Sequence, residues 1–358
     1  MNIQRLISLL LCLLLVLSML PSCGTSDTTT PANVDPASPQ AKSYYDFFDT
    51  VTVIFSYKND TAEEFANNCQ AVSALLQEYH RLFDIYYEYA GINNLKTVND
   101  NAGKEPVAVD DKLIDFLLYT KEVYTLTGGM TNVAMGSVLK LWHDERENGI
   151  DDPESASLPD GAKLSAAAQH TDINQLIIDK EAGTVYLADP AMRLDVGAIA
   201  KGYATEKAAQ LLIARGVTSY VLNVGGNIRT IGTKPSGNGW VTGITNPDKT
   251  SEKSFVCKVD IKNISLVTSG DYERYYLVDG VPYHHIIDPK TNMPANYFSS
   301  ISVFCIDGGL ADALSTALFC MTYEEGLKLV NSIGGVDVIW VDKSGTLLKT
   351  NGISLYDN

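Results

Sequence analysis

Apolar residues recur along the chain with two different spacings, and each spacing predicts one type of element. From residue 61 to residue 83 the apolar positions step by three and four, which is typical of one buried face of an amphipathic helix. Thr61 and Glu64 form the pattern of a capping box at the start of this helix. Residues 51–55 alternate instead, which favours a strand. The folded part of the chain is therefore expected to begin with a strand followed by a helix.

The same two patterns continue towards the C-terminus. Further helices are expected at residues 111–126, 199–215, 310–321 and 323–333. Further strands are expected at residues 176–179, 184–187, 219–224, 273–278, 283–287, 302–306, 336–341 and 346–349. The strict alternation of strand and helix that marks a doubly wound sheet is missing. We therefore predict an α+β fold with mixed, largely antiparallel sheets and flanking helices.

The first 40 residues differ from the rest and predict an export signal followed by a tether. Residues 1–22 carry an early cation, Arg5, and then an uncharged apolar run that is shorter than the ~20 residues needed to span a bilayer. Residues 20–23 (Leu-Pro-Ser-Cys) resemble a bacterial lipoprotein cleavage site, so we expect cleavage before Cys23 and a lipid on its sulfur. An uncleaved anchor helix is the alternative. Residues 23–40 are rich in Ser, Thr, Pro and Asp and are expected to be flexible.

This organisation predicts one folded domain at residues 41–358, held by lipid on the bacterial cell membrane and facing away from the cytoplasm. The composition is that of a globular protein, with 358 residues of which 45% are hydrophobic and 20% charged. Lys and Arg total 27 against 43 Asp and Glu, so the formal net charge is −16. A field of this sign repels a phosphate backbone, so nucleic acid is not an expected partner.

Cysteine spacing argues against a metal centre. Of the six cysteines, Cys12 belongs to the signal and Cys23 to the lipid site. The four that remain are Cys69, Cys257, Cys305 and Cys320. None of them forms a CxxC pair, and several have apolar neighbours. Buried free thiols are therefore favoured over a disulfide, which stays the alternative in an exported protein.

Two segments offer chemistry suited to a diphosphate and a cation. Neither GxxxxGK[ST] nor GxGxxG lies between a strand and a helix, but residues 195–204 (DVGAIAKGYA) place glycines at a helix start and supply Lys201. A plain glycine turn with a solvated lysine is the alternative. Asp312 and Thr316 are four residues apart on a predicted helix, so they share a face and can offer oxygen ligands to a hard cation. The alternative is that Asp312 complements the helix dipole and Thr316 bonds to the preceding turn.

Two further segments are less informative alone. The chain has five histidines, and two of them, His284 and His285, are adjacent on a predicted strand and so point to opposite faces. One of them can face a given pocket and act as a general base, although a structural histidine is the common alternative. Residues 223–228 (NVGGNI) predict a tight turn or bulge between strands.

In this order and spacing, the segments resemble the flavin transferase family named ApbE. The matching segments are residues 194–204, 223–227, 268–272, 285–289 with Pro294, and 311–317, and weaker matches extend the similarity back to about Asp46. The resemblance implies a T-fold-related architecture. It also implies an enzyme that uses FAD as substrate and Mg²⁺ as cofactor, moves FMN to a Thr or Ser hydroxyl of an exported flavoprotein and releases AMP.

The resemblance carries over to particular residues. Asp312 and Thr316 match side-chain metal ligands, and Ala198 matches a ligand that acts through its carbonyl oxygen. His285 stands where the family has its candidate base, and Lys201 would stabilise the departing phosphate. The positions that correspond to FAD contacts are Tyr86, Met130, Thr131, Asn132, Asp195, Lys201 and Ile286.

Three departures from the family pattern concern the flavin more than the metal. Residues 48–50 (Phe-Asp-Thr) replace a Met-Gly-Thr, which removes a glycine. Asn132 and Ala134 replace an Asp and a Thr. Asn292 replaces a glycine, which asparagine can do in a left-handed turn.

Two other functions stay open from the sequence. An FAD pyrophosphatase would use water in place of the acceptor hydroxyl and produce FMN and AMP. A tethered lipoprotein that binds flavin without chemistry fits the linker after Cys23 equally well.

Overall fold

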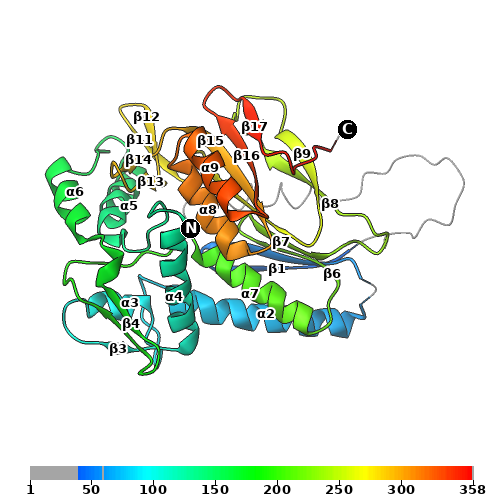
Figure 1. The fold of residues 1–358 in the computed structure, drawn as a ribbon, viewed down its shortest axis with the longest axis horizontal. Coiled ribbons are helices and arrows are strands. Elements are labelled where there is room, and N and C mark those ends of the chain that lie inside the picture. The colour runs from blue at the N-terminus through cyan, green and yellow to red at the C-terminus, as the bar shows by residue number, and fades with distance from the viewer. Residues whose placement is uncertain (1–38, 59, 357–358) are drawn as a thin grey trace, which may run out of the picture.

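The computed structural model describes residues 39–58 and 60–356 (Figure 1). Its centre is an eight-stranded sheet with the order β1-β2-β6-β7-β10-β15-β16-β17, and all neighbouring strands in it are antiparallel. These strands are β1 (Gln40–Phe47), β2 (Thr50–Ser56), β6 (Ser219–Val224), β7 (Asn227–Gly232), β10 (Ser265–Gly270), β15 (Phe298–Cys305), β16 (Asp337–Asp342) and β17 (Leu347–Lys349). The predicted signal, Cys23 and most of the predicted tether lie outside the described residues, so these predictions are not tested.

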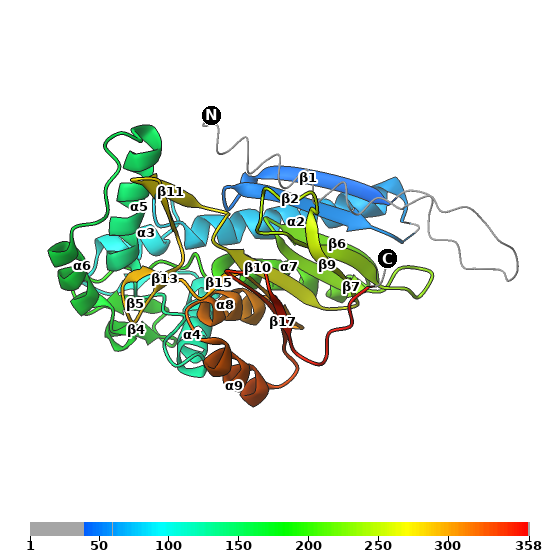
Figure 2. The ribbon, with the colours of Figure 1, turned by 90° about the horizontal axis from the view of Figure 1, so that it is seen from above.

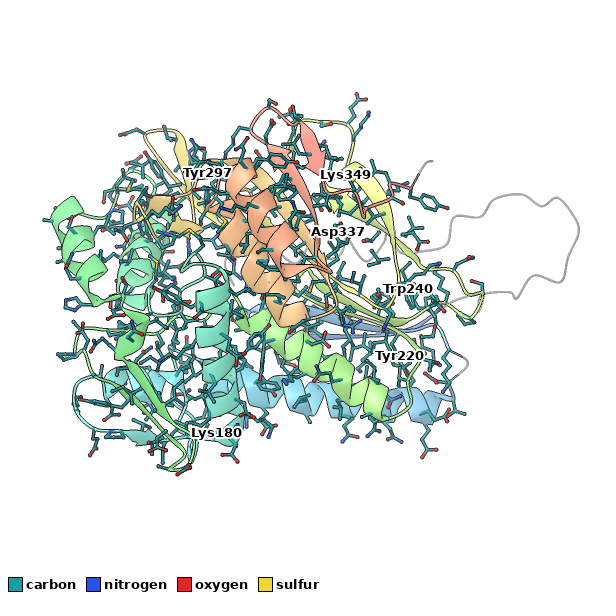
Figure 3. The ribbon with its side chains drawn as sticks, in the orientation of Figure 1. Lys180, Tyr220, Trp240, Tyr297, Asp337 and Lys349 are labelled. Atoms are coloured by element: carbon teal, nitrogen blue, oxygen red, sulfur yellow. The ribbon has the colours of Figure 1, made fainter. Side chains whose placement is uncertain are left out.

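Side chains of the sheet alternate between two cores. Val53 and Phe55 of β2 belong to one apolar cluster, whereas Ile54 between them belongs to the other. The first cluster is closed by a hairpin of β8 (Trp240–Thr245) and β9 (Phe255–Ile261), and the second by helices. Trp240 and Tyr220, both labelled in Figure 3, lie in the first and the second cluster respectively. The sheet is therefore buried on both faces at strands such as β2 and β6, whereas the edge strand β1 is largely exposed.

Helices cover one face of this sheet (Figures 1 and 2). They are α2 (Ala62–Phe83), α7 (Ala200–Ala214), α8 (Gly308–Phe319) and α9 (Tyr323–Ile333). The capping box predicted at the start of α2 is present, with the Thr61 side chain accepting from Glu64 N and the Glu64 side chain accepting from Thr61 N. Helices α7 and α8 pack directly on each other, and both contribute residues to the cavity described below.

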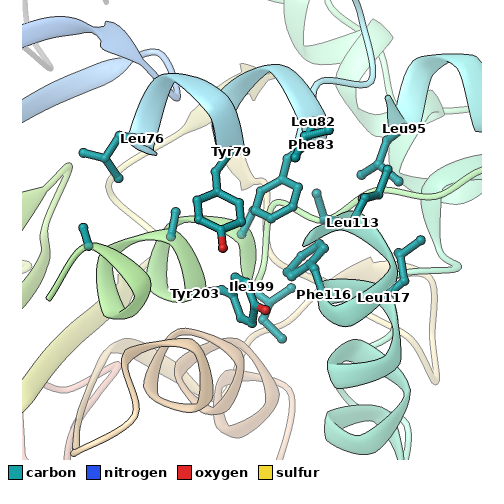
Figure 4. Close-up of a cluster of buried hydrophobic side chains, with 14 of the residues drawn as sticks. Leu76, Tyr79, Leu82, Phe83, Leu95, Leu113, Phe116, Leu117, Ile199 and Tyr203 are labelled. Carbon is teal, nitrogen blue, oxygen red and sulfur yellow. The ribbon is translucent and has the colours of Figure 1, made fainter. Parts of the chain in front are cut away.

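Aromatic rings join α2, α7 and α4 (Asp111–Leu126) in the largest apolar cluster (Figure 4). The rings of Phe83 and Phe116 are stacked with centroids 4.0 Å apart, and Tyr203 meets the Phe116 ring at 4.9 Å. Burying one such ring stabilises the fold by about 1.5–3 kcal/mol. The cluster therefore fixes α7, which carries part of the site, against the rest of the molecule.

The remaining elements gather at one end of the molecule, on the left in Figures 1 and 2. The helices there are α3 (Leu95–Asp100), α5 (Gly136–Asp151) and α6 (Gly161–Ala167), with short 3₁₀ turns at Ala168–His170 and Ile173–Gln175. Small sheets complete this end, formed by β3 (Val107–Ala108), β4 (Leu176–Asp179) and β5 (Thr184–Leu187), by β11 (Tyr275–Val278) with β12 (Val281–His284), and by β13 (Ile287–Asp288) with β14 (Met293–Pro294).

The α+β fold with largely antiparallel sheets is confirmed, but several elements differ from the sequence prediction. Helices α3, α5 and α6 and strands β1, β3, β7 to β10 and β14 have no counterpart among the predicted ranges. The strand predicted at 283–287 has the wrong bounds: β12 spans Val281–His284, because the turn at Asp279 and Gly280, both with positive φ, joins Val278 directly to Val281. The predicted free thiols are confirmed, since Cys69, Cys257, Cys305 and Cys320 are unpaired and Cys257 alone is only partly buried. Within residues 39–58 and 60–356, no helix has the length and apolarity that crossing a bilayer requires.

Candidate active site

A cavity of about 620 Å³ opens where several turns and helix ends meet, and this volume is typical of ligand sites. The β1–β2 and β6–β7 turns, the start of α7, helix α8 and the residues after β12 contribute to its wall. The structure brings to this cavity every predicted site residue that it describes, namely Tyr86, Met130, Thr131, Asn132, Asp195, Ala198, Lys201, His285, Ile286, Asp312 and Thr316. The roles assigned to them stay predictions.

Two hairpin turns form part of the cavity wall. Gly225 and Gly226 both have positive φ and join β6 to β7, as the sequence predicted. A Cβ on Gly225 would stand 2.3 Å from Thr50 Oγ1, so this position requires glycine. In the neighbouring β1–β2 turn, Phe48 (φ 53°) and Asp49 (φ 51°) hold the left-handed conformation without glycine. Where the family pattern has a glycine, this chain therefore carries backbone strain beside the cavity.

The segment before α7 is fixed by side chains from elsewhere. Asn99 donates to Leu194 O at 3.0 Å and accepts from Leu194 N at 2.7 Å. The Asp195 carboxylate then accepts from Gly197 N at 2.9 Å, which shapes the turn that leads into the helix. Lys201 follows in the first turn of α7 and lines the cavity. Residues 195–199, predicted to contact a diphosphate, thus form a turn that hydrogen bonds hold in place before the N-terminus of α7.

Helices α7 and α8 cross at a glycine. A Cβ on Gly202 would lie 2.2 Å from Gly308 O and 2.4 Å from Asp312 Cβ, so only glycine allows this approach. Gly202 N donates to Asp312 Oδ2 at 2.8 Å. Burial raises the pKa of Asp312, whose side chain is 5% exposed, while Lys201 and this hydrogen bond act in the opposite direction. Thr316 lies one turn later on α8 and also lines the cavity.

The donor set around Asp312 fits a hard divalent cation. Asp312 supplies a buried carboxylate that lines the cavity, and Thr316 and Ala198 line the same cavity with hydroxyl and carbonyl oxygens in their residues. Among the described residues, no group of three His, Cys, Asp or Glu side chains could hold a metal. A cation at Asp312 would therefore need oxygens from hydroxyl, carbonyl and ligand phosphate groups, as Mg²⁺ in phosphate sites does.

The adjacent histidines have different surroundings. His284 Nε2 donates to Ala295 O at 2.7 Å, and its Nδ1 accepts from Ile286 N at 3.2 Å, so this ring is a neutral structural group. His285 Nδ1 lies 3.2 Å from Arg274 O, which can only accept, so Nδ1 carries the proton and Nε2 the lone pair. Both residues line the cavity although strand alternation predicted opposite faces, because β12 ends at His284.

Two arginines of the cavity wall were missed by the sequence reasoning. Burial lowers the pKa of His285 well below its usual value, and the guanidinium groups of Arg274 and Arg146 lower it further. Arg146 Nη2 donates to His143 Nδ1 at 2.8 Å. Helix α5 was not predicted, yet its cavity-lining residues Leu139, Trp142, His143 and Arg146 follow the helical spacing that could have revealed it.

The predicted FAD contacts are also involved in the structure of the wall. Thr131 Oγ1 donates to Ala313 O at 2.7 Å, which links the loop after α4 to α8. Asn132 donates to Thr171 O and accepts from Ala134 N, both at 2.9 Å. Tyr86 is 53% exposed, and its ring lies 5.4 Å from that of His143. Asn292 has φ 59°, which confirms that asparagine replaces the glycine in a left-handed turn.

Fold and cavity together define an α+β protein with one large cavity of the size of a ligand site among the described residues. The family model described as "ApbE family" matches residues 48–340, and the chain belongs to this family, as its motifs indicated. The FAD:protein FMN transferase of Treponema pallidum (strain Nichols) is 34% identical over 311 residues, covering 83% of each chain. That of Klebsiella pneumoniae (strain 342) is 29% identical over 283 residues, covering 78% of this chain and 85% of the relative.

Solved structures agree with the fold. The ApbE protein of Thermotoga maritima superposes with a TM-score of 0.76 at 26% identity, covering 88% of this chain and 98% of the other. The flavin transferase ApbE of Vibrio cholerae has a TM-score of 0.72 at 24% identity, with the same coverage of both chains. The ApbE-like architecture predicted from the motifs is therefore confirmed.

Proposed function

We propose that this chain is a Mg²⁺-dependent FAD:protein FMN transferase that moves FMN from FAD to a Thr or Ser hydroxyl of an exported flavoprotein and releases AMP. The observation that carries the proposal is convergence: residues from separate motifs, spread from Tyr86 to Thr316, line a single cavity. Curated relatives over most of the chain are named FAD:protein FMN transferases, which supports the same reaction. The substrate is therefore FAD, and the partner is a protein.

FAD binding requires local compensation of charge, because the chain has a net charge of −16. Lys201 and the N-terminal turn of α7 offer positive potential to the diphosphate. Asp312, Thr316 and the Ala198 carbonyl would hold Mg²⁺, which supplies charge neutralisation to the phosphate oxygens when it is bound. Tyr86 at the rim offers an aromatic face to the flavin ring.

The transfer breaks a phosphoanhydride bond of FAD and forms a phosphate ester with the acceptor. The acceptor hydroxyl oxygen forms a bond to the FMN-side phosphorus, and the bond from that phosphorus to the bridging oxygen of the diphosphate breaks, so AMP leaves. The hydroxyl proton passes to Nε2 of His285, which is the unprotonated nitrogen of that ring. Lys201 stabilises the charge that develops on the departing AMP phosphate. Positioning and charge stabilisation thus supply most of the rate enhancement.

The decisive experiment incubates the chain with FAD, Mg²⁺ and a candidate exported acceptor, and then measures the acceptor by mass spectrometry. An increase of one FMN residue on a Thr or Ser supports the proposal. Free FMN and AMP with an unmodified acceptor would identify a pyrophosphatase instead. FAD recovered intact would identify a binding lipoprotein.

Asp312→Asn keeps the side chain's shape and removes its charge, so it separates these outcomes further. We expect FMN transfer to fall by at least about 10²-fold at a fixed Mg²⁺ concentration, as loss of a group that stabilises developing charge does. Higher Mg²⁺ should restore part of the rate. An Asp312→Asn variant with unchanged transfer and unchanged Mg²⁺ dependence would remove Asp312 from the metal site.

We also propose that the mature chain is a lipoprotein that begins at Cys23 and is anchored to the outer face of the cytoplasmic membrane or an equivalent extracytoplasmic surface. The apolar run at residues 6–20 and the Leu-Pro-Ser-Cys sequence at 20–23 support this proposal. Labelling of growing cells with radioactive palmitate tests it. The label should follow the protein into the membrane fraction and be lost in Cys23→Ala, whereas a labelled Cys23→Ala chain would refute the assignment.

A further inference from the structure

A buried ion pair joins α7 to β7, and neither of its residues lines the cavity. Arg229 Nε of β7 lies 2.8 Å from Glu206 Oε2 of α7, and the two residues are 2% and 7% exposed. Such pairs contribute little net stability, because the cost of removing both charges from water offsets their attraction. A pair of apolar residues of similar volume would hold these elements together as well. Both residues make further hydrogen bonds.

Glu206 reaches the start of α8. Its Oε2 also accepts from Gly308 N, the first residue of that helix, at 3.3 Å. One turn away, Gly202 N donates to Asp312 Oδ2 at 2.8 Å. Residues 202 and 206 share a face of α7, and residues 308 and 312 share a face of α8, because residues four apart on a helix lie one above the other. The two helices are therefore joined at two successive points, and Asp312 itself forms one of them.

Arg229 connects Glu206 to strand β7. It lies on β7 shortly after the Gly225–Gly226 turn, which lines the cavity, and its Nη1 donates to Thr230 O at 2.5 Å. The guanidinium is thus held by its own strand while Nε binds Glu206. The Glu206 carboxylate therefore links β7 to α7 and α8, the two helices that carry Lys201 and Asp312.

We infer that the Glu206–Arg229 pair is a positioning device that fixes the offset of α8 along α7, and through it the placement of Asp312 and Thr316 relative to Lys201. This inference rests on the proposed function, since it assigns the pair a role in holding the Mg²⁺ ligands. Neither residue lines the cavity, so both act through the residues that do. A shift of α8 along α7 would move Asp312 relative to Lys201, because Asp312 lies on α8 and Lys201 on α7.

The test measures FAD binding by quenching of flavin fluorescence, in EDTA and over a Mg²⁺ titration. In Glu206→Gln, which keeps the shape of the side chain, the Mg²⁺ concentration for half-saturation should rise at least about tenfold, as loss of a group that orients a metal ligand does. FAD affinity in EDTA should change less than about threefold, because Lys201 and Tyr86 line the cavity from outside α8.

A double variant guards against failure to fold. Glu206→Leu with Arg229→Leu removes both charges together, which often preserves stability, but it also removes the acceptor for Gly308 N. Its Mg²⁺ half-saturation should rise as in Glu206→Gln. Tyr220→Phe is the matched control, because it removes buried hydrogen bonds to Asp60 and Asn68, away from the cavity. This control should lower stability and leave the Mg²⁺ titration unchanged.

The outcomes are distinct. Variants of the pair that lose only stability, with the wild-type Mg²⁺ half-saturation, would overturn the positioning role while leaving the proposed function standing. A wild-type chain whose FAD binding does not respond to Mg²⁺ would remove the metal-dependent function, and the inference with it. If the Mg²⁺ concentration for half-saturation rises in both variants of the pair and not in Tyr220→Phe, the positioning role of the Glu206–Arg229 pair is supported.

Discussion

At the scale of single residues, hydrogen-bond partners decide which of two identical side chains can react. His284 and His285 are neighbours in sequence and both line the cavity. Both nitrogens of His284 bond to backbone groups, which leaves this ring no role in proton transfer. His285 uses only Nδ1 in this way and keeps Nε2 as a base. The sequence identifies the two histidines as candidates for the base. The tautomer of His285 follows from its contact with Arg274 O, which forms only in the folded chain.

The arginines beside His285 predict a shift in the pH profile of FMN transfer. Burial and the positive charges of Arg274 and Arg146 lower the pKa of His285 and so keep it neutral. Arg146→Gln removes one positive charge, which makes protonation easier and raises this pKa. The acidic limb of kcat/KM should therefore move to higher pH, by up to about one unit.

A charge-matched control makes this measurement specific. Arg215→Gln removes the same charge at the exposed end of α7, where Arg215 Nε donates to Asn68 Oδ1. Profiles measured from pH 8 down to the lowest pH at which the chain stays folded should shift for Arg146→Gln and stay in place for Arg215→Gln. If the acidic limb stays at the same pH in both variants, a group other than His285 takes the proton.

At the scale of elements, the crossing of α7 and α8 depends on the absence of one side chain. Gly202→Ala places a Cβ 2.2 Å from Gly308 O and 2.4 Å from Asp312 Cβ, so the helices must separate. We expect the free energy of unfolding to fall by about 1–3 kcal/mol, as overpacking in a well-packed interior does, and Mg²⁺ affinity to fall with it. Denaturant unfolding and the Mg²⁺ titration measure the two effects.

Gly161→Ala provides the comparison for that substitution. Gly161 begins α6, and a Cβ there meets nothing within 4 Å. Alanine favours helix over glycine by up to about 1 kcal/mol, so this variant should be as stable as the parent or slightly more stable. If both variants behave alike, the close approach of α7 to α8 does not limit stability.

The sequence predicted elements well where periodicity and capping agreed. In α2 a capping box precedes a regular apolar stripe, and the helix was found within a residue of its observed bounds. In α5 acidic and basic residues crowd the helix, and its cavity-lining face was not recognised. Motifs likewise identified Asp312 and Lys201, whereas Glu206 resembles a charge on a solvated helix face. Its burial depends on Arg229, which pairs with it only in the folded chain.

At the scale of the whole molecule, three histidines couple stability to pH. Burial is the first cause that lowers the pKa of His143, His284 and His285 in the folded chain. Near pH 6.5 the unfolded chain therefore binds more protons than the folded chain, so stability rises with pH. The contribution is complete above the unfolded pKa and is lost as pH falls below it. Each histidine that stays neutral adds at most about 1.4 kcal/mol per pH unit.

The net charge of −16 acts in the opposite direction, because protonation relieves repulsion in the folded state. Between pH 7.5 and pH 5.5, however, carboxyl groups with ordinary pKa values near 4 remain almost fully ionised, so this repulsion hardly changes. The histidines therefore dominate, and the free energy of unfolding in urea should be lower at pH 5.5 than at pH 7.5. His285→Asn should show a smaller difference between the two pH values, because one of the three groups no longer titrates. Equal or greater stability at pH 5.5 in the parent chain would contradict the lowered pKa values of these rings.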